Sequence, residues 1–181
     1  MTPAGFRLDI TREMFRVQRQ RRDDIRASLA TPVAALAFSV FNLATLAPLI
    51  DLGASGRLDA LIWGLALVAV LALVGAALLI VRVEWRFIYL DPPDLEAVVE
   101  AERQLAERVS DADERLERLR DYMAGAYDIG YRRYFAENEQ RARDRTYGLR
   151  LIILALAVLM VAFTLVPLAA TYAIGIIGFF V

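Results

Sequence analysis

Three long stretches without a charged residue constrain the fold of this chain more than any other feature. They cover residues 30–50, residues 60–81 and the segment that follows Arg150. A helix needs roughly 20 apolar residues to cross the hydrocarbon core of a bilayer. Three such stretches within 181 residues favour transmembrane helices over the buried core of a soluble helical protein. We therefore expect an all-α integral membrane protein with three transmembrane helices.

The third stretch is too long for one crossing and too short for two. Its 31 residues would extend about 46 Å as one helix, against about 30 Å of hydrocarbon. We expect one crossing over residues 150–171, with a kink or an end near Pro167, because proline breaks the helical hydrogen-bond ladder. An apolar tail with Gly175 and Gly178 would follow, so the third segment and its tail occupy residues 150–181. A longer kinked helix and a re-entrant tail are the alternatives.

The arginines predict the orientation. Seven of them precede the first stretch, only Arg57 lies between the first and the second, and thirteen lie from Arg82 to Arg150. Positively charged loops stay in the cytoplasm. We expect the N-terminus in the cytoplasm and the C-terminus outside. The lipid bilayer is then its first partner.

Residue types that are missing exclude most enzyme chemistry. The chain has no Cys, no His and no Lys. These absences remove thiolate nucleophiles, the commonest metal ligand and general base, and Schiff-base chemistry. We expect a protein that is not an enzyme and that binds neither a cofactor nor a metal.

The connection between the second and third stretches is long and highly charged. Its 69 residues from Arg82 to Arg150 contain thirteen arginines and sixteen acids. Ten residues of this connection follow one another at alternating steps of three and four, and nine of them are apolar. They are Leu95, Val98, Glu102, Leu105, Val109, Ala112, Leu116, Leu119, Met123 and Ala126. Such a heptad seam is typical of a coiled coil.

This connection must return to the membrane that it leaves. A single helix over residues 94–150 would end about 85 Å away, so we expect a cytoplasmic helical hairpin, coiled-coil-like, over residues 82–149. Two glycines favour a tip at residues 125–130. Ser110 and Asp111, in a capping pattern, mark the alternative tip. The remaining parts are then a basic amphipathic helix over residues 1–29 and a transmembrane hairpin over residues 30–81.

Aromatic and arginine side chains in the second half of the connection are candidates for binding a ligand or a partner. The candidates are Tyr127, Tyr131, Arg132, Arg133, Tyr134, Arg141 and Arg145. Stacked rings beside guanidinium groups suit a nucleotide or a partner peptide. The alternative, which the spacing of the tyrosines favours, is that they pack against the heptad seam. A nucleic-acid duplex is not an expected partner.

The first transmembrane stretch carries a polar stripe of Thr31, Ser39, Asn42 and Thr45. At about 100° per residue these four lie within an arc of about 120°. An amide near the middle of a bilayer is costly. The stripe could form an interhelical hydrogen bond, which we favour, or line a pore in an oligomer; a chance clustering is the third alternative.

The order of these parts resembles a known family. An arginine-rich helix (MFRVQRQRRDDIRASLATP) leads into a membrane hairpin, and a long helix with a Tyr-Arg segment (YRRYFAENEQRARDR) follows. This layout is similar to the SLATT-type effectors of bacterial phage defence, which have two transmembrane helices. The resemblance implies a homo-oligomer that permeabilises the inner membrane when its cytoplasmic part receives a soluble defence protein or a nucleotide signal.

Two other functions compete with this effector. A non-conducting membrane anchor or scaffold would dock a soluble partner through the same hairpin. A small transporter is weakened by the lack of charge within the apolar stretches and by the lack of an internal repeat.

Overall fold

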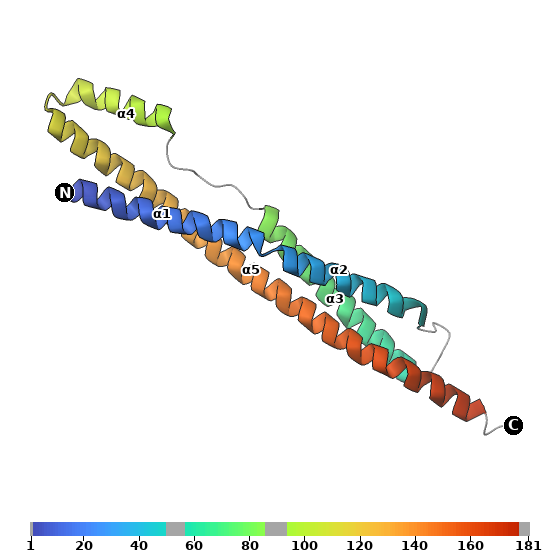
Figure 1. The fold of residues 1–181 in the computed structure, drawn as a ribbon. Helices are drawn as coiled ribbons and strands as arrows, with labels where there is room; N and C mark the ends of the chain where they lie inside the picture. The colour runs from blue at the N-terminus through green and yellow to red at the C-terminus, as the bar shows by residue number, and fades with distance from the viewer. Residues whose placement is uncertain (1, 50–56, 86–93, 178–181) are drawn as a thin grey trace. The chain divides into compact units, whose positions relative to one another are not determined.

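The computed structural model describes residues 2–49, 57–85 and 94–177, with the backbone alone for residues 170 and 172–177. These residues form helices and contain no strand, as Figure 1 shows. The helices are α1 (Pro3–Ala27), α2 (Ala30–Leu46), the short 3₁₀ helix η1 (Ala47–Leu49), α3 (Arg57–Trp85), α4 (Leu95–Arg108) and α5 (Ala112–Ile177). Three helical stretches are long and apolar enough to cross a membrane. The expected all-α fold is confirmed.

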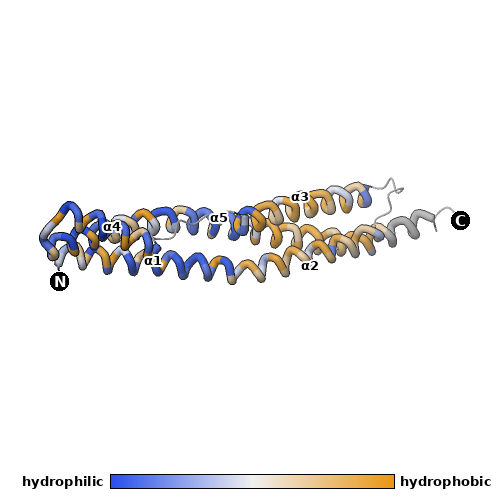
Figure 2. The backbone as a smooth tube through the Cα atoms, turned by 90° about the horizontal axis from the view of Figure 1, so that it is seen from above, coloured by the Kyte–Doolittle hydropathy of each residue, from blue (hydrophilic) through white to orange (hydrophobic). Residues whose placement is uncertain are grey.

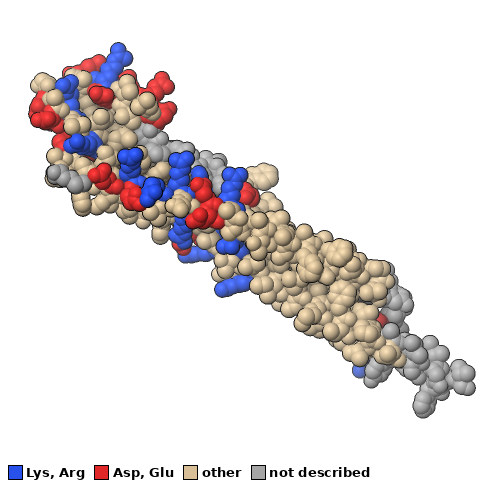
Figure 3. Space-filling model, viewed as in Figure 1, with Lys and Arg blue, Asp and Glu red and all other residues tan. Residues whose placement is uncertain are grey.

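The chain divides into two compact units. The first, here called the polar unit, consists of Met1–Ala27 and Arg86–Ala142, and the second, the apolar unit, of Ser28–Trp85 and Arg143–Val181. Helix α5 supplies residues to both. Hydrophobic residues dominate α2, α3 and the later part of α5 (Figure 2). Charged side chains gather over the polar unit in Figure 3, whereas the surface of the apolar unit is almost free of them in that view.

Helices α2, α3 and the later part of α5 pack side by side in the apolar unit (Figure 1). The buried residues of α3 recur in steps of three and four: Ile62, Ala66, Ala69, Leu73, Ala76, Ile80 and Val83. Buried residues of α5 follow the same steps: Gly148, Ile152, Ala155, Leu159 and Ala162. This spacing is typical of left-handed bundles with small crossing angles.

Small side chains bring these helices close together. A Cβ atom placed on Gly148 would lie 3.6 Å from the backbone oxygen of Ala76 and 3.6 Å from the side chain of Ile80. Ala76 is fully buried, and Ala72, four residues earlier on α3, is also buried. Close approach between small residues is the main source of helix association in lipid.

The turn of the predicted hairpin lies at Val109–Asp111, so the preferred tip at residues 125–130 is wrong. Gly125 and Gly130 both lie within α5, where a glycine costs only about 1 kcal/mol relative to alanine. Val109 is extended, and the Asp111 carboxylate accepts a hydrogen bond from the Asp113 backbone N–H at 3.2 Å. A capping carboxylate satisfies a free N–H at a helix start. The cap therefore decides where α5 begins.

Helix α4 begins at Leu95, the first position of the predicted heptad seam, and lies beside the start of α5 (Figure 1). The Asp94 side chain accepts from the Ala97 backbone N–H at 2.9 Å and caps the helix; the two prolines before it lie outside the described residues. Side chains of both helices line one cavity: Glu102, Leu105 and Ala106 from α4, with Ala112, Leu116 and Leu119 from α5. The part of the predicted heptad seam on α4 and the part on α5 thus line the same cavity.

Helix α5 continues through Pro167 to Ile177. The expected end of the helix near Pro167 is therefore wrong, and the longer helix among the alternatives is the one observed. Pro167 removes one backbone donor, and the Thr171 hydroxyl donates to the Pro167 carbonyl at 3.1 Å and to the Leu168 carbonyl at 2.9 Å. Gly178 lies outside the described residues.

Candidate partner-binding site

Helix α1 lies parallel to the first half of α5 within the polar unit. Three pairs join them at nearly constant sequence separation: Thr2 with Arg120, Arg7 with Asp121, and Arg21 with Glu139. Buried and half-buried residues of α1 again follow steps of three and four: Ala4, Leu8, Thr11, Phe15, Gln18, Arg22 and Ile25. The N-terminal helix is therefore half of a parallel coiled-coil-like pair.

The tyrosines of α5 form the core of this pair. Phe15 is only 4% exposed, and its ring centroid lies 5.0 Å from that of Tyr134, edge on, and 5.6 Å from that of Tyr127. Tyr134 is fully buried. Edge-to-face pairs contribute about 0.5–1.5 kcal/mol beyond the burial of their area. The aromatic stripe thus packs against α1.

Polar side chains extend this core beyond the aromatic rings. The Asn138 amide donates to the Gln18 backbone carbonyl at 2.8 Å and to the Gln18 side-chain oxygen at 3.2 Å, and both residues are buried. The Arg141 guanidinium is 4% exposed and donates to Glu137 at 3.4 Å. Buried amides need such partners to offset the water that they lose. The Gln18–Asn138 pair therefore fixes the register of α1 on α5.

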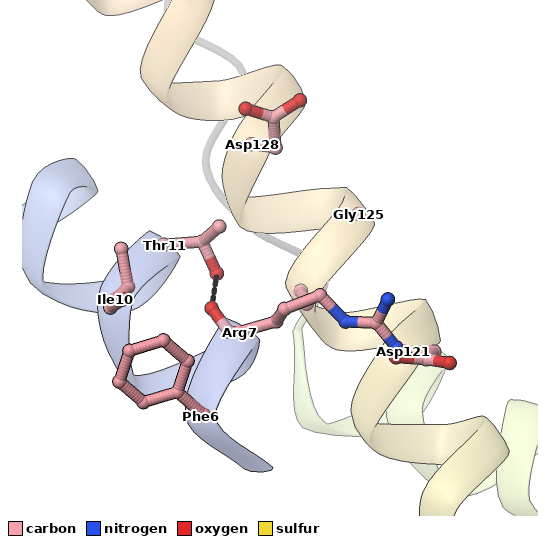
Figure 4. Close-up of a pocket in the computed structure, with 8 residues that line it drawn as sticks. Phe6, Arg7, Ile10, Thr11, Asp121, Gly125 and Asp128 are labelled. Carbon is pink, nitrogen blue, oxygen red and sulfur yellow. Dashed lines mark hydrogen bonds and ion pairs between the residues drawn. The ribbon is translucent and has the colours of Figure 1, made fainter. Parts of the chain in front are cut away.

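A groove opens beside this core, between residues 6–11 of α1 and residues 121–128 of α5 (Figure 4). It is a cavity of about 410 Å³. Its lining residues are Phe6, Arg7, Ile10 and Thr11 from α1, and Asp121, Ala124, Gly125 and Asp128 from α5.

Its walls are apolar and its charges are paired. Arg7 bridges to Asp121 at 2.6 Å, and Asp128 pairs with Arg132 at 2.9 Å. An added Cβ atom on Gly125 would meet nothing within 4 Å. The groove therefore suits apolar side chains of a partner with a polar rim around them.

The apolar wall continues along the exposed side of α1. Phe6, Ile10, Met14 and Val17 are separated by four, four and three residues, and all are at least 40% exposed. Exposed apolar stripes at helical spacing are typical of helix-in-groove recognition. The candidate residues predicted from the sequence do not include this stripe, although its spacing of four, four and three residues indicates one apolar face of a helix.

The predicted binding residues do not form one cluster. Tyr127 and Tyr134 contact Phe15 in the core, whereas Tyr131 is half-buried beside the Phe135 ring at 6.0 Å. The arginines differ in environment: Arg132 and Arg133 are exposed, Arg141 is buried, and Arg145 is half-buried in the apolar unit. Ligand binding by any of them stays a prediction.

The polar stripe of α2 divides between two environments. Ser39 is fully buried in the apolar unit and donates to the Ala35 carbonyl at 2.7 Å. Asn42 is half-buried, and Thr31 and Thr45 are exposed. The Asn42 amide donates to the Phe38 carbonyl at 2.9 Å and the Thr45 hydroxyl to the Asn42 carbonyl at 2.8 Å. These donors are satisfied within their own helix.

No protein-family model, curated protein or solved structure matches this chain. The function therefore has to be argued from its own residues.

Proposed function

We propose that this protein is a homo-oligomeric effector of bacterial antiviral defence that permeabilises the inner membrane when its cytoplasmic part receives a signal. The polar unit is the cytoplasmic part in this proposal, and the groove between α1 and α5 is the receiving surface. A soluble defence protein is the ligand that this groove suits best, and a nucleotide signal is the alternative. The layout that resembles the SLATT-type effectors supports the same role.

Insertion of the apolar unit into a bilayer is supported by its surface. Large apolar residues point outward, among them Phe41, Leu71 and Met160, each more than 60% exposed, while alanines fill the interior. In water such a surface would be an aggregation hazard, whereas lipid tails solvate it. Helix α3, with 29 residues, would extend about 44 Å and span the bilayer with some tilt.

The observation that carries the proposal is that α5 serves both units. Residues 121–128 of α5 form one wall of the groove, and its later residues form the buried seam of the apolar unit. A partner that displaces or clamps α1 against α5 would act on a helix that also belongs to the membrane part. The groove that would receive the partner and the apolar unit that would respond thus share one helix, α5.

The direct test is the membrane potential of cells that express the chain with its neighbouring genes during phage infection. We expect depolarisation in the wild type and its loss in Ile10→Asp, which places a charge in the groove. Val99→Asp, an equally simple change at an exposed α4 residue outside the groove, is the control and should depolarise normally. No depolarisation in infected wild-type cells would refute the effector function.

A non-conducting anchor is the second candidate, and the groove favours it equally. It predicts that a soluble protein co-purifies in a fixed ratio with the wild type and is lost with Ile10→Asp. It also predicts that the membrane stays intact. Potential measurement and purification on the same cells separate the two functions.

A further inference from the structure

One side of α5 changes from basic to apolar within the apolar unit. The residues of this outer face of α5 follow steps of four and three and are all exposed: Arg143, Tyr147, Arg150, Leu154, Ala157 and Val161. The buried residues from Gly148 to Ala162 lie on the other side of the helix, at about 100° per residue. One side of α5 therefore packs in the bundle, and the outer face does not.

The two arginines of the outer face have no acidic partner. Neither Arg143 nor Arg150 forms an ion pair or a hydrogen bond with another of the described residues. The two acids closest to Arg143 in the sequence are already engaged: Asp144 pairs with Arg82 at 3.5 Å, and Glu139 pairs with an arginine of α1 at 2.7 Å. The basic end of the outer face therefore carries a net positive charge.

Aromatic side chains indicate the depth of these arginines in a bilayer. The Arg150 guanidinium carbon lies 5.7 Å from the centroid of the Tyr147 ring, which is 56% exposed. Trp85, the last residue of α3, is 84% exposed, and the ion pair of Asp144 joins this end of α3 to the same part of α5. Exposed tryptophan and tyrosine rings are enriched at the level of the lipid head groups. The arginines of the outer face are then level with the lipid phosphates.

We infer that the outer face of α5 binds one anionic phospholipid. Its phosphate lies between the guanidinium groups of Arg143 and Arg150, and one acyl chain lies along Leu154, Ala157 and Val161. The inference rests on the membrane insertion in the proposed function and adds a lipid ligand to it.

The chemistry of the outer face selects this class of ligand. Arg143 and Arg150 are two helical turns apart, about 10.5 Å along the axis, and their long side chains can meet at one phosphate. Guanidinium groups donate paired hydrogen bonds to phosphate oxygens. A zwitterionic lipid carries its own cation, whereas an anionic lipid matches the net positive charge. Only a ligand with a phosphate at one end and an apolar chain at the other covers the whole face.

Native mass spectrometry of the full-length protein tests the lipid directly. The protein is released from detergent micelles that contain equal amounts of phosphatidylglycerol and phosphatidylcholine. We expect the wild type to retain phosphatidylglycerol at least about tenfold more than phosphatidylcholine, because each arginine near a lipid surface favours an anionic head group. The double variant Arg143→Gln, Arg150→Gln should retain the two lipids about equally.

The matched control is the double variant Arg103→Gln, Arg108→Gln. Both arginines are exposed on α4, in the polar unit, so this variant removes the same charge elsewhere and should retain phosphatidylglycerol as the wild type does. None of the four arginines is buried, so circular dichroism should show unchanged helix content in both double variants. Excess inorganic phosphate should leave the lipid bound, because it has no acyl chain.

The outcomes separate this inference from the proposed function. No lipid preference in the wild type, an equal loss in both double variants, or displacement of the lipid by inorganic phosphate would overturn the lipid site. Retained phosphatidylglycerol in a protein whose cells never depolarise would support the site and refute the effector. Depolarisation by a wild type without lipid preference would refute only the site.

Discussion

Phe15 and Phe6 lie on one helix and have opposite roles. Phe15 is 4% exposed and sits between two tyrosine rings, whereas Phe6 is 55% exposed at the mouth of the groove. Burying a phenylalanine side chain stabilises a fold by about 1.5–3 kcal/mol. The same residue type therefore contributes to folding at one position and is available to a partner at the other.

Phe15→Ala should destabilise the polar unit by about 3–5 kcal/mol, because it leaves a cavity between Tyr127 and Tyr134. Phe6→Ala should change stability by less than about 1 kcal/mol. Unfolding in detergent micelles, followed by the near-ultraviolet circular dichroism of the tyrosines, measures both. Equal effects of the two variants would contradict the packing described here.

Glu117 connects the start of α1 to α5 in a pH-dependent way. A hydrogen bond from the Thr2 side chain, and then Arg120, lower the pKa of Glu117 below its ordinary value of 4.5. A lowered pKa in the folded state means that the stabilisation is present above the unfolded pKa and is lost as the pH falls through the folded pKa.

We therefore expect the stability difference between the wild type and Glu117→Gln to be constant near neutral pH and to shrink below pH 4.5. Resistance of α1 to proteolysis, measured on both proteins across that range, gives the difference. A difference that stays unchanged into strong acid would show that this carboxylate does not hold α1.

Helix α5 shows which local signals decide where a helix begins and whether it continues. Its start at Ala112 follows the Asp111 cap, with Asp113 and Glu114 in the first turn, where carboxylates complement the helix dipole. The two glycines of the expected tip are helical because a glycine lowers helix stability without ending the helix. Only packing on α1 and α4 shows that the helix persists through them.

Gly125→Ala tests this placement of the turn. No described glycine has a positive φ, and an added Cβ atom at Gly125 meets nothing within 4 Å. We expect the variant to be more stable than the wild type by about 0.5–1 kcal/mol, because alanine favours a helix interior. Thermal unfolding measures the change, and a clear loss of stability would indicate a tight turn at this position.

At the scale of the whole molecule, the buried residues of the two units have the same helical spacing but are of different types. Steps of three and four bury tyrosine, asparagine and arginine in the polar unit and alanine, leucine and isoleucine in the apolar unit. The exposed surface is charged in the polar unit and mostly apolar in the apolar unit. This contrast is what supports a membrane location for the apolar unit.

The predicted orientation is tested with single cysteines and a maleimide that cannot cross membranes. In intact spheroplasts we expect Arg57→Cys to be labelled and Glu107→Cys to be protected. After lysis both should be labelled, which controls for their reactivity. The reverse pattern would invert the topology and place the polar unit outside.

The sequence by itself determined the helices that could span a membrane and the helical character of the connection. Those features depend on local hydropathy and spacing, which act over a few residues. Of the two tips that the sequence offered, the structure has the one at Val109–Asp111. The tertiary structure alone decided that α1 pairs with α5 and that Tyr134 is part of their core. Both depend on which of two similar faces of a helix meets a partner distant in sequence, and helical periodicity does not distinguish such faces.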